Sequence, residues 1–272
     1  MTEIQAPAAE VVLELDALSD TGTERDHNED AAGMVVEGPG RALLAVADGV
    51  SGQEGGEVAS QMAIEVLLRA FAETPEKLGA GQRLYRAVQQ ANIEIYDRAI
   101  AVPELRGMAT TLTALAVDGG EATVVHVGDS RLYLVRGGAI TQLTKDHTVA
   151  AEKARYGLLS KEKARTHADR CALTRSVGRE LIVSRDRATH RVVDGDVLLL
   201  CSDGLYNVLA DDELEEAIRG RDPPAACRAL VERANARGTP DNLTAAVLRV
   251  SGTAARPARS GLAERVRRLI GR

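Results

Sequence analysis

The chain has 272 residues, of which 44% are hydrophobic and 27% charged, with a formal net charge of −6 and only 2% aromatic residues. This length is ample to bury a core, and the composition excludes a wholly disordered, collagenous or coiled-coil chain. The acidic balance and the scarcity of rings argue against a nucleic-acid partner, because phosphate backbones attract cationic surfaces and base stacking needs exposed rings.

The cysteine pattern and the hydropathy indicate where the protein works. Cys171, Cys201 and Cys227 lie far apart and form no C-x-x-C pair, so neither a disulfide framework nor a zinc site built from thiolates is expected. The first 14 residues lack a basic and apolar leader, and the apolar runs are far shorter than the ~18 residues that span a bilayer. We therefore expect a cytoplasmic protein without a transmembrane segment.

The N-terminal part predicts three strands followed by two helices. Residues 11–18, 31–37 and 41–48 have strand-like apolar patterns, and a Gly-Pro-Gly turn predicts that the second and third form an antiparallel hairpin. Apolar residues at helical spacing then predict amphipathic helices over 53–73 and 81–101.

The middle of the chain returns to a strand pattern. Residues 110–117, 122–127, 130–135 and 139–142 alternate with glycine-containing turns, which predicts a meander that forms a second antiparallel sheet. Residues 145–170 are rich in charge and poor in large apolar side chains, so we predict a mobile surface flap there.

The last third predicts a strand at 197–202, helices at 211–219 and 223–237, and a closing strand at 242–250. The whole order is strands, two helices, strands, two helices and a strand. This order predicts an α+β fold over residues 1–250, a four-layer α/β/β/α sandwich of two antiparallel sheets flanked by helix pairs.

Residues 251–272 form a basic amphipathic tail with six arginines and one glutamate. Leu262, Val266, Leu269 and Ile270 fall on one helical face. Two interpretations stay open: a solvated terminal helix or disordered arm, and a segment that docks to a partner or to a membrane surface.

Four aspartates flank apolar strands: Asp48, Asp129 and Asp203 follow such runs, and Asp241 precedes one. Carboxylates at the rim of a core are partly desolvated, and several of them repel one another unless a cation neutralises them. Oxygen ligands without His or Cys favour hard ions such as Mg²⁺ or Mn²⁺. The pattern therefore indicates a metal site.

Asp-Gly pairs also form ordinary turns, and this interpretation suits Asp118 and Asp194, which lie in glycine-rich turns. Asp48 and Asp203 instead end strongly apolar strands, and a glycine after each lets the backbone approach a ligand closely. Arg25 lies in a run of acids, and a guanidinium beside a metal cluster is suited to clamp two oxygens of a phosphoryl group.

Seven motifs in order resemble the metal-dependent serine/threonine protein phosphatases of type 2C (PPM), in their compact bacterial form. They are Arg25–Asp30, Val46–Gly52, Ala109–Leu112, His126–Arg131, Leu173–Gly178, Cys201–Leu205 and Asp241–Thr244. Each motif is weakly specific alone, whereas the ordered set is strongly specific and spans about residues 11–250.

The resemblance implies a ligand set for two Mn²⁺ or Mg²⁺ ions. It makes Asp48 the carboxylate that bridges both metals, with the Gly49 carbonyl on one of them. It also makes Asp203 and Asp241 ligands of the other metal. The same likeness implies that Glu29 and Asp30 approach the second metal directly or through water.

Three further roles follow from the resemblance. Asp129 matches the acid that, together with Asp203, holds a third and weaker metal in bacterial members. Arg25 matches the arginine that binds phosphate, and Asn242 is expected to brace the site from behind. Val50 stands where some relatives carry a histidine that is a candidate acid for the leaving group, and His147 is a speculative substitute.

The expected activity is hydrolysis of phosphoserine or phosphothreonine on cytoplasmic proteins by a metal-activated water, opposing a serine/threonine kinase. Two alternatives stay open. One is a catalytically weak module that binds phosphoproteins, which a missing metal aspartate would favour. The other is a dedicated switch protein that acts on one partner.

Overall fold

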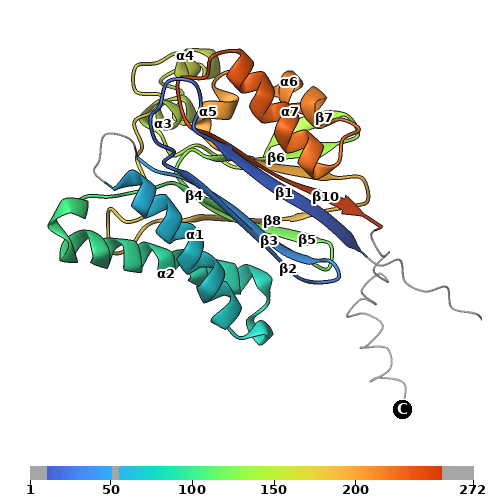
Figure 1. Cartoon of the computed structure of the whole chain (residues 1–272), viewed down its shortest axis with the longest axis horizontal. Coiled ribbons are helices and arrows are strands. Elements are labelled where there is room, and N and C mark those ends of the chain that lie inside the picture. Colours follow the sequence, from blue (N-terminus) through green and yellow to red (C-terminus); the bar gives the residue numbers. More distant parts are fainter. Residues whose placement is uncertain (1–10, 51–54, 253–272) are drawn as a thin grey trace, which may run out of the picture.

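Two antiparallel sheets pack face to face, and helices cover the outer face of each one (Figure 1). The structure is a computed structural model that describes residues 11–50 and 55–252. Within these residues each sheet has five strands. The four-layer sandwich expected from the sequence is therefore confirmed.

The first sheet has the order β1-β10-β9-β6-β7 and the second has the order β2-β3-β4-β5-β8. The strands of the first sheet are β1 (Val12–Asp20), β10 (Leu243–Ser251), β9 (Val197–Cys201), β6 (Arg131–Arg136) and β7 (Ala139–Gln142). Those of the second are β2 (Asp30–Gly38), β3 (Arg41–Asp48), β4 (Leu112–Asp118), β5 (Glu121–Val127) and β8 (Asp186–Arg191).

Two long helices lie on the second sheet and two on the first. They are α1 (Gly56–Glu73) and α2 (Ala80–Ala101) on the second sheet, and α6 (Asp211–Ile218) and α7 (Pro223–Ala236) on the first. The shorter elements are η1 (Glu76–Leu78), η2 (Pro103–Leu105), α3 (Val149–Arg155), α4 (Lys161–Arg165) and α5 (Asp203–Tyr206). None of the helices in these described ranges is long and apolar enough to cross a lipid bilayer.

The central strands are buried on both faces, which explains their unbroken apolar sequences. In β3, Leu43 packs toward the α1–α2 layer and Leu44 toward the other sheet, and both are fully buried. All five residues of β9 are likewise buried. A strand covered on both faces loses the polar alternation of a half-exposed one.

The predicted meander over residues 110–142 is wrong. β4 and β5 pair with each other inside the second sheet, whereas β6 and β7 belong to the first. The chain crosses between the sheets at Gly128, whose φ is 109° and where a Cβ would lie 2.6 Å from the Cβ of Thr111. Alternation along a strand reveals its buried face and not its partner, so the sequence pattern could not distinguish this crossing from a hairpin turn.

The segment predicted as a flap contains α3 and α4, which begin with side-chain caps from Thr148 and Ser160. A bridge joins Thr148, near its start, to Leu173, three residues beyond its end. The mobility of the flap stays a prediction. The loop at 51–54 and the basic tail after residue 252 lie outside the described residues.

Candidate active site

The first pair of acidic residues meets where β2 begins and β3 ends. The register of the two strands places Asp30 directly opposite Asp48. The backbone of Asp48 is held by Thr111, whose amide donates to the Asp48 carbonyl at 2.8 Å and whose hydroxyl accepts from the Asp48 amide at 3.0 Å. The hydroxyl of Thr110 also donates to the Asp48 carbonyl, at 2.8 Å. The main chain of Asp48 is thus fixed by Thr110 and Thr111, the two residues just before β4.

The second pair, Asp203 and Asp241, comes from the other sheet. Asp203 opens α5 directly after β9, and Asp241 lies two residues before β10. The two segments approach closely because Gly204 has no side chain. A Cβ at this position would lie 2.0 Å from the Asn242 carbonyl oxygen and 3.4 Å from the Asp241 Cβ.

Asn242 ties the acidic loop before β2 to the start of β10. Its amide nitrogen donates to the carbonyls of Thr21 and His27, both at 2.8 Å, and its carbonyl oxygen accepts from the Glu29 amide at 2.8 Å. Asn242 is 3% exposed, so loss of these bonds would leave polar groups unpaired in the interior.

Glu29 and Gly49 lie against the start of α1. The Gly49 amide donates to the Glu29 carbonyl at 3.0 Å. A Cβ on Gly49 would lie 2.5 Å from the Gly56 carbonyl, and one on Gly56 would lie 3.0 Å from a carboxylate oxygen of Glu29. Neither Gly49 nor Gly56 therefore has room for a side chain. Because both are glycines, the Gly49 main chain can lie close to the acidic cluster.

Arg25 reaches the cluster through Asp241. One of its terminal nitrogens lies 3.0 Å from each carboxylate oxygen of Asp241. Its side chain is 36% exposed, so the guanidinium has an open side that could meet an anion from solvent.

The carboxylates repel one another strongly. Burial raises the pKa of Asp48 well above its usual range, and the charges of Asp30, Asp203, Asp129 and Asp241 raise it further. Five acids from both sheets therefore form one electrostatic cluster.

Asp30 has the clearest protein partners of the five. Burial raises the pKa of Asp30 to about 7, although hydrogen bonds from the hydroxyls of Ser202 (2.6 Å) and Thr244 (2.7 Å) act in the opposite direction. Burial also raises the pKa of Asp203 to about 6. The sequence analysis missed Ser202 and Thr244, because only the fold brings their strands to Asp30.

Asp129 lies at the crossing between the sheets and is 6% exposed. Burial raises the pKa of its carboxyl well above the usual range, and the largest charged contribution is that of Asp203. The hydroxyl of Tyr206 donates to the Asp129 main-chain oxygen at 3.0 Å. Asp129, two residues before β6, and Asp203, two residues after β9, thus lie at the same end of two paired strands of the first sheet.

The chemistry of these residues fits a hard cation, because the donors are all oxygens and Arg25 offsets only part of their negative charge. Over residues 11–50 and 55–252, no three His, Cys, Asp or Glu side chains are arranged as a closed metal-binding group. The carboxylates are turned toward protein partners: Asp203 accepts from Asn207 at 3.1 Å and Asp241 from Arg25.

His147 is not placed as an acid for the leaving group. Its Nδ1 accepts from the Gly128 amide at 3.1 Å, and its Nε2 lies 3.3 Å from Asp186 and 3.2 Å from Arg175. Both ring nitrogens are occupied and the side chain is buried, so His147 has a structural position at the start of the flap.

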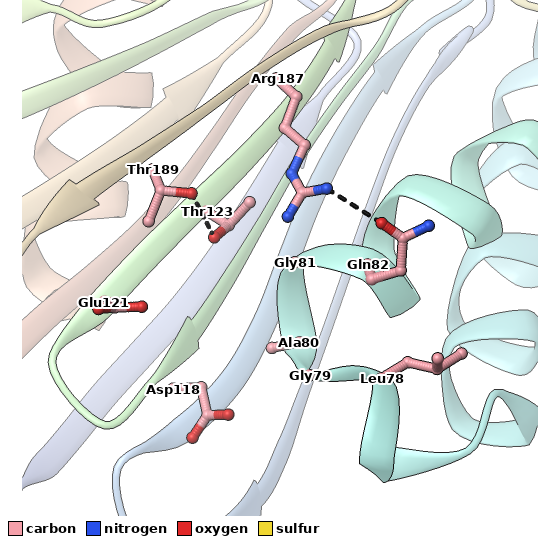
Figure 2. Close-up of a pocket in the computed structure, with 10 residues that line it drawn as sticks. All are labelled: Leu78, Gly79, Ala80, Gly81, Gln82, Asp118, Glu121, Thr123, Arg187 and Thr189. Carbon is pink, nitrogen blue, oxygen red and sulfur yellow. Dashed lines mark hydrogen bonds between the residues drawn. The ribbon is translucent and has the colours of Figure 1, made fainter.

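Two cavities formed by the described residues lie away from the acidic cluster. One, of about 240 Å³, lies between the start of α2 and strands β5 and β8, where Arg187 donates to Gln82 at 3.2 Å and Thr123 bonds Thr189 at 3.0 Å (Figure 2). The other, of about 320 Å³, lies beside the active-site end of β8. Neither is lined by the clustered aspartates, so the candidate site is marked by charge rather than by cavity volume.

Comparisons with known proteins show related sequences over most of the chain. Residues 23–247 match the family described as protein phosphatase 2C. The chain is 36% identical over 230 residues to the serine/threonine phosphatase stp of Listeria monocytogenes, covering 83% of this chain and 91% of that protein.

Solved structures show the same similarity. The serine/threonine phosphatase PstP/Ppp of Mycobacterium tuberculosis superimposes with a TM-score of 0.80 at 35% identity, covering 88% of this chain and 99% of that one. The catalytic domain of PstP in complex with two manganese ions gives a TM-score of 0.78 at 35% identity, covering 89% and 99%.

Proposed function

The chain belongs to the protein phosphatase 2C family, and from this premise we propose that it hydrolyses phosphoserine and phosphothreonine on proteins with two Mn²⁺ or Mg²⁺ ions. The observation that carries the proposal is the gathering of Asp48 with Asp30, Asp129, Asp203 and Asp241 at one site, which raises the pKa of Asp48. Such a cluster is costly in an apo protein and is stabilised by divalent cations.

Asp48 would hold both ions, and the Gly49 carbonyl would hold one of them. Asp203 and Asp241 would hold one ion, and Glu29 and Asp30 would approach the other. When bound, a pair of such ions lowers the pKa of a shared water and supplies the nucleophile. A third and weaker ion would lie between Asp129 and Asp203.

Arg25 would bind the phosphoryl group. Its exposed guanidinium lies over Asp241, which fixes its direction, and the fork geometry of arginine matches two phosphoryl oxygens. Asn242 would keep the loop of Glu29 and Arg25 at a fixed distance from Asp241, through its bonds to Thr21, His27 and Glu29. With Val50 in place of a histidine, the leaving alkoxide would take its proton from water.

We place the reaction in the cytoplasm, opposing a serine/threonine kinase. All three cysteines are free thiols, and two of them are buried, which suits a reducing compartment. This pairing would be tested by measuring phosphate release from proteins that a co-expressed serine/threonine kinase from the same source has phosphorylated.

The deciding experiment is hydrolysis of p-nitrophenyl phosphate and of a phosphothreonine peptide by the purified protein with Mn²⁺, with Mg²⁺ and with EDTA. We expect phosphate release with metal and none after chelation. A folded sample that binds the phosphopeptide without releasing phosphate would overturn the proposal in favour of a phosphoprotein-binding module.

A further inference from the structure

The residue after the Asp129 turn, Arg131, forms a buried ion pair with the first part of the flap. Its Nε lies 3.0 Å from Oδ1 of Asp146 and its Nη2 lies 2.7 Å from Oδ2. The two side chains are only 12% and 15% exposed. The remaining terminal nitrogen donates to the Tyr133 hydroxyl at 2.8 Å. A forked pair of this kind fixes both partners in orientation as well as in charge.

Tyr206 connects the same turn to α5. Its hydroxyl donates to the Asp129 main-chain oxygen at 3.0 Å, and its ring lies 3.5 Å below the Arg131 guanidinium. Asp203 opens this one-turn helix three residues earlier. Tyr206 therefore holds Asp129 and Arg131 against the helix that carries Asp203.

Two hydrogen bonds join the flap to the opposite side of the Asp129 turn. The His147 amide donates to the Gly128 carbonyl at 2.8 Å, and the Gly128 amide donates to His147 Nδ1 at 3.1 Å. Together with the Arg131–Asp146 pair, these bonds make the turn a rigid link between the flap and α5. The link uses the main chain of Asp129, and we assign none of the side chains that form it to a metal.

We propose that Tyr206 is a positioning residue that sets the spacing between Asp129 and Asp203 and, through Arg131 and Asp146, couples this spacing to the start of the flap. The metal-dependent part of this inference rests on the proposed function. A displacement of Asp146 and His147 would move Asp129 relative to Asp203, while Asp48 and Asp241 would stay in place. The flap would thereby adjust the weaker ion site without contacting the other two.

Tyr206→Phe tests the link, because it removes the hydroxyl and keeps the ring under Arg131. Tyr133→Phe is the matched control, since it removes the tyrosine hydroxyl that accepts from the Arg131 guanidinium but leaves the Asp129 turn untouched. In the metal-free protein we expect amide hydrogen exchange at Gly128 and His147 to be about 10-fold faster in Tyr206→Phe and unchanged in Tyr133→Phe. Equal exchange in the two variants would overturn the positioning role.

Manganese binding tests the consequence for the ion site. Titration with free Mn²⁺ followed by electron paramagnetic resonance should show a Kd for the weakest ion that is about 5-fold or more higher in Tyr206→Phe, with the tighter ions unchanged. Asp146→Asn, on the flap side, should give the same selective loss. Weakening of all ions together would overturn the coupling. Absence of Mn²⁺ binding in the unmodified protein would instead reject the proposed function, and the exchange data would still decide the role of Tyr206.

Discussion

Asp30 and Asp48 lie directly opposite each other in the β2–β3 pair, so two carboxylates share one rung of the sheet at the rim of the core. Like charges at such positions destabilise a sheet. Ser202 and Thr244 direct two hydroxyls to Asp30, which relieves part of this cost. Asp48 is buried and surrounded by the charges of four other aspartates, so its charge is one that a bound cation would stabilise strongly.

Asp48→Asn should separate the metal role of this residue from its effect on stability. We expect turnover to fall by at least about 100-fold, because a direct ligand matters more than the outer partners whose loss costs about 10–100-fold. In EDTA the variant should be more stable than the unmodified protein, with a Tm higher by about 2–4 °C for each kcal/mol of repulsion removed. Asp118→Asn, at the exposed end of β4, is the control. Full Mn²⁺-dependent activity in Asp48→Asn would contradict the assignment of the site.

The pH dependence of stability should change sign when metal is added. Without metal, the pKa of Asp30 is about 7 and that of Asp203 about 6, both above the value of 3.8 in an unfolded chain. Protonation of these groups therefore favours the folded state, and this stabilisation is lost as pH rises through 6 to 7. In EDTA, we expect a lower Tm at pH 8 than at pH 6.5.

With saturating Mn²⁺ the order should reverse, because metal competes with protons for the same oxygens. Calorimetry in buffers of different ionisation enthalpy should record proton release on Mn²⁺ binding near pH 6.5. Measurements below pH 6 are avoided because of His126, whose pKa is lowered by burial to about 4. In that range the histidine takes up a proton in the unfolded chain but not in the fold, which lowers the stability of the fold. A Tm independent of pH in EDTA would contradict the buried repulsion.

Much of the fold was readable from the sequence, because the apolar runs of β3 and β9 and the helical spacing of α1 and α2 are local properties. The partner of each strand was not readable. β8, with its polar sequence Asp186–Arg191, was missed as an edge strand that alternates half-buried and exposed residues. The pairing of β1 with β10, over more than 220 residues of chain, is likewise a product of tertiary packing.

For the candidate site, the sequence indicated which acids matter and could not indicate what holds them. Asp203 and Asp241 are recognisable beside their apolar strands. The role of Gly204 in bringing them together depends on a contact between two distant segments. Tyr206 carries no local signal either, because a tyrosine in a short helix is ordinarily a packing residue.

Arg25→Ala should act mainly on substrate binding. Charged hydrogen bonds contribute about 1.5–3 kcal/mol, so we expect KM for a phosphothreonine peptide to rise about 10-fold or more with a smaller change in kcat. Arg25→Lys keeps the charge and loses the fork, and should give an intermediate KM. Steady-state kinetics with Mn²⁺ would measure both. A fall in kcat with unchanged KM would instead give Arg25 a role confined to the transition state.

Removal of the basic tail should leave the chemistry intact. A chain ending at Gly252 keeps every described strand and helix. We therefore expect unchanged kcat and KM for p-nitrophenyl phosphate, whether the tail is a solvated arm or a docking segment. Equal or weaker binding of the full chain, relative to the shortened one, to vesicles containing anionic lipid would argue against docking to a membrane surface.

Gly204→Ala should disrupt the site from within the backbone. The new Cβ would lie 2.0 Å from the Asn242 carbonyl oxygen, which is backbone and cannot turn aside. The segments of Asp203 and Asp241 must then separate, and overpacking of this kind costs about 1–3 kcal/mol. We expect a lower urea midpoint and about 10-fold or greater loss of Mn²⁺ affinity.

The matched control for this change is Gly81→Ala, near the start of α2. Its Cβ would first meet the terminal nitrogen of Arg187, a flexible side chain that can move away. Because alanine restricts the unfolded chain, this variant should be neutral or more stable by up to about 1 kcal/mol, with unchanged Mn²⁺ affinity. If both variants retained the Mn²⁺ affinity of the unmodified protein, the close approach at Gly204 would be a matter of packing alone, and the spacing of Asp203 and Asp241 would not control the metal site.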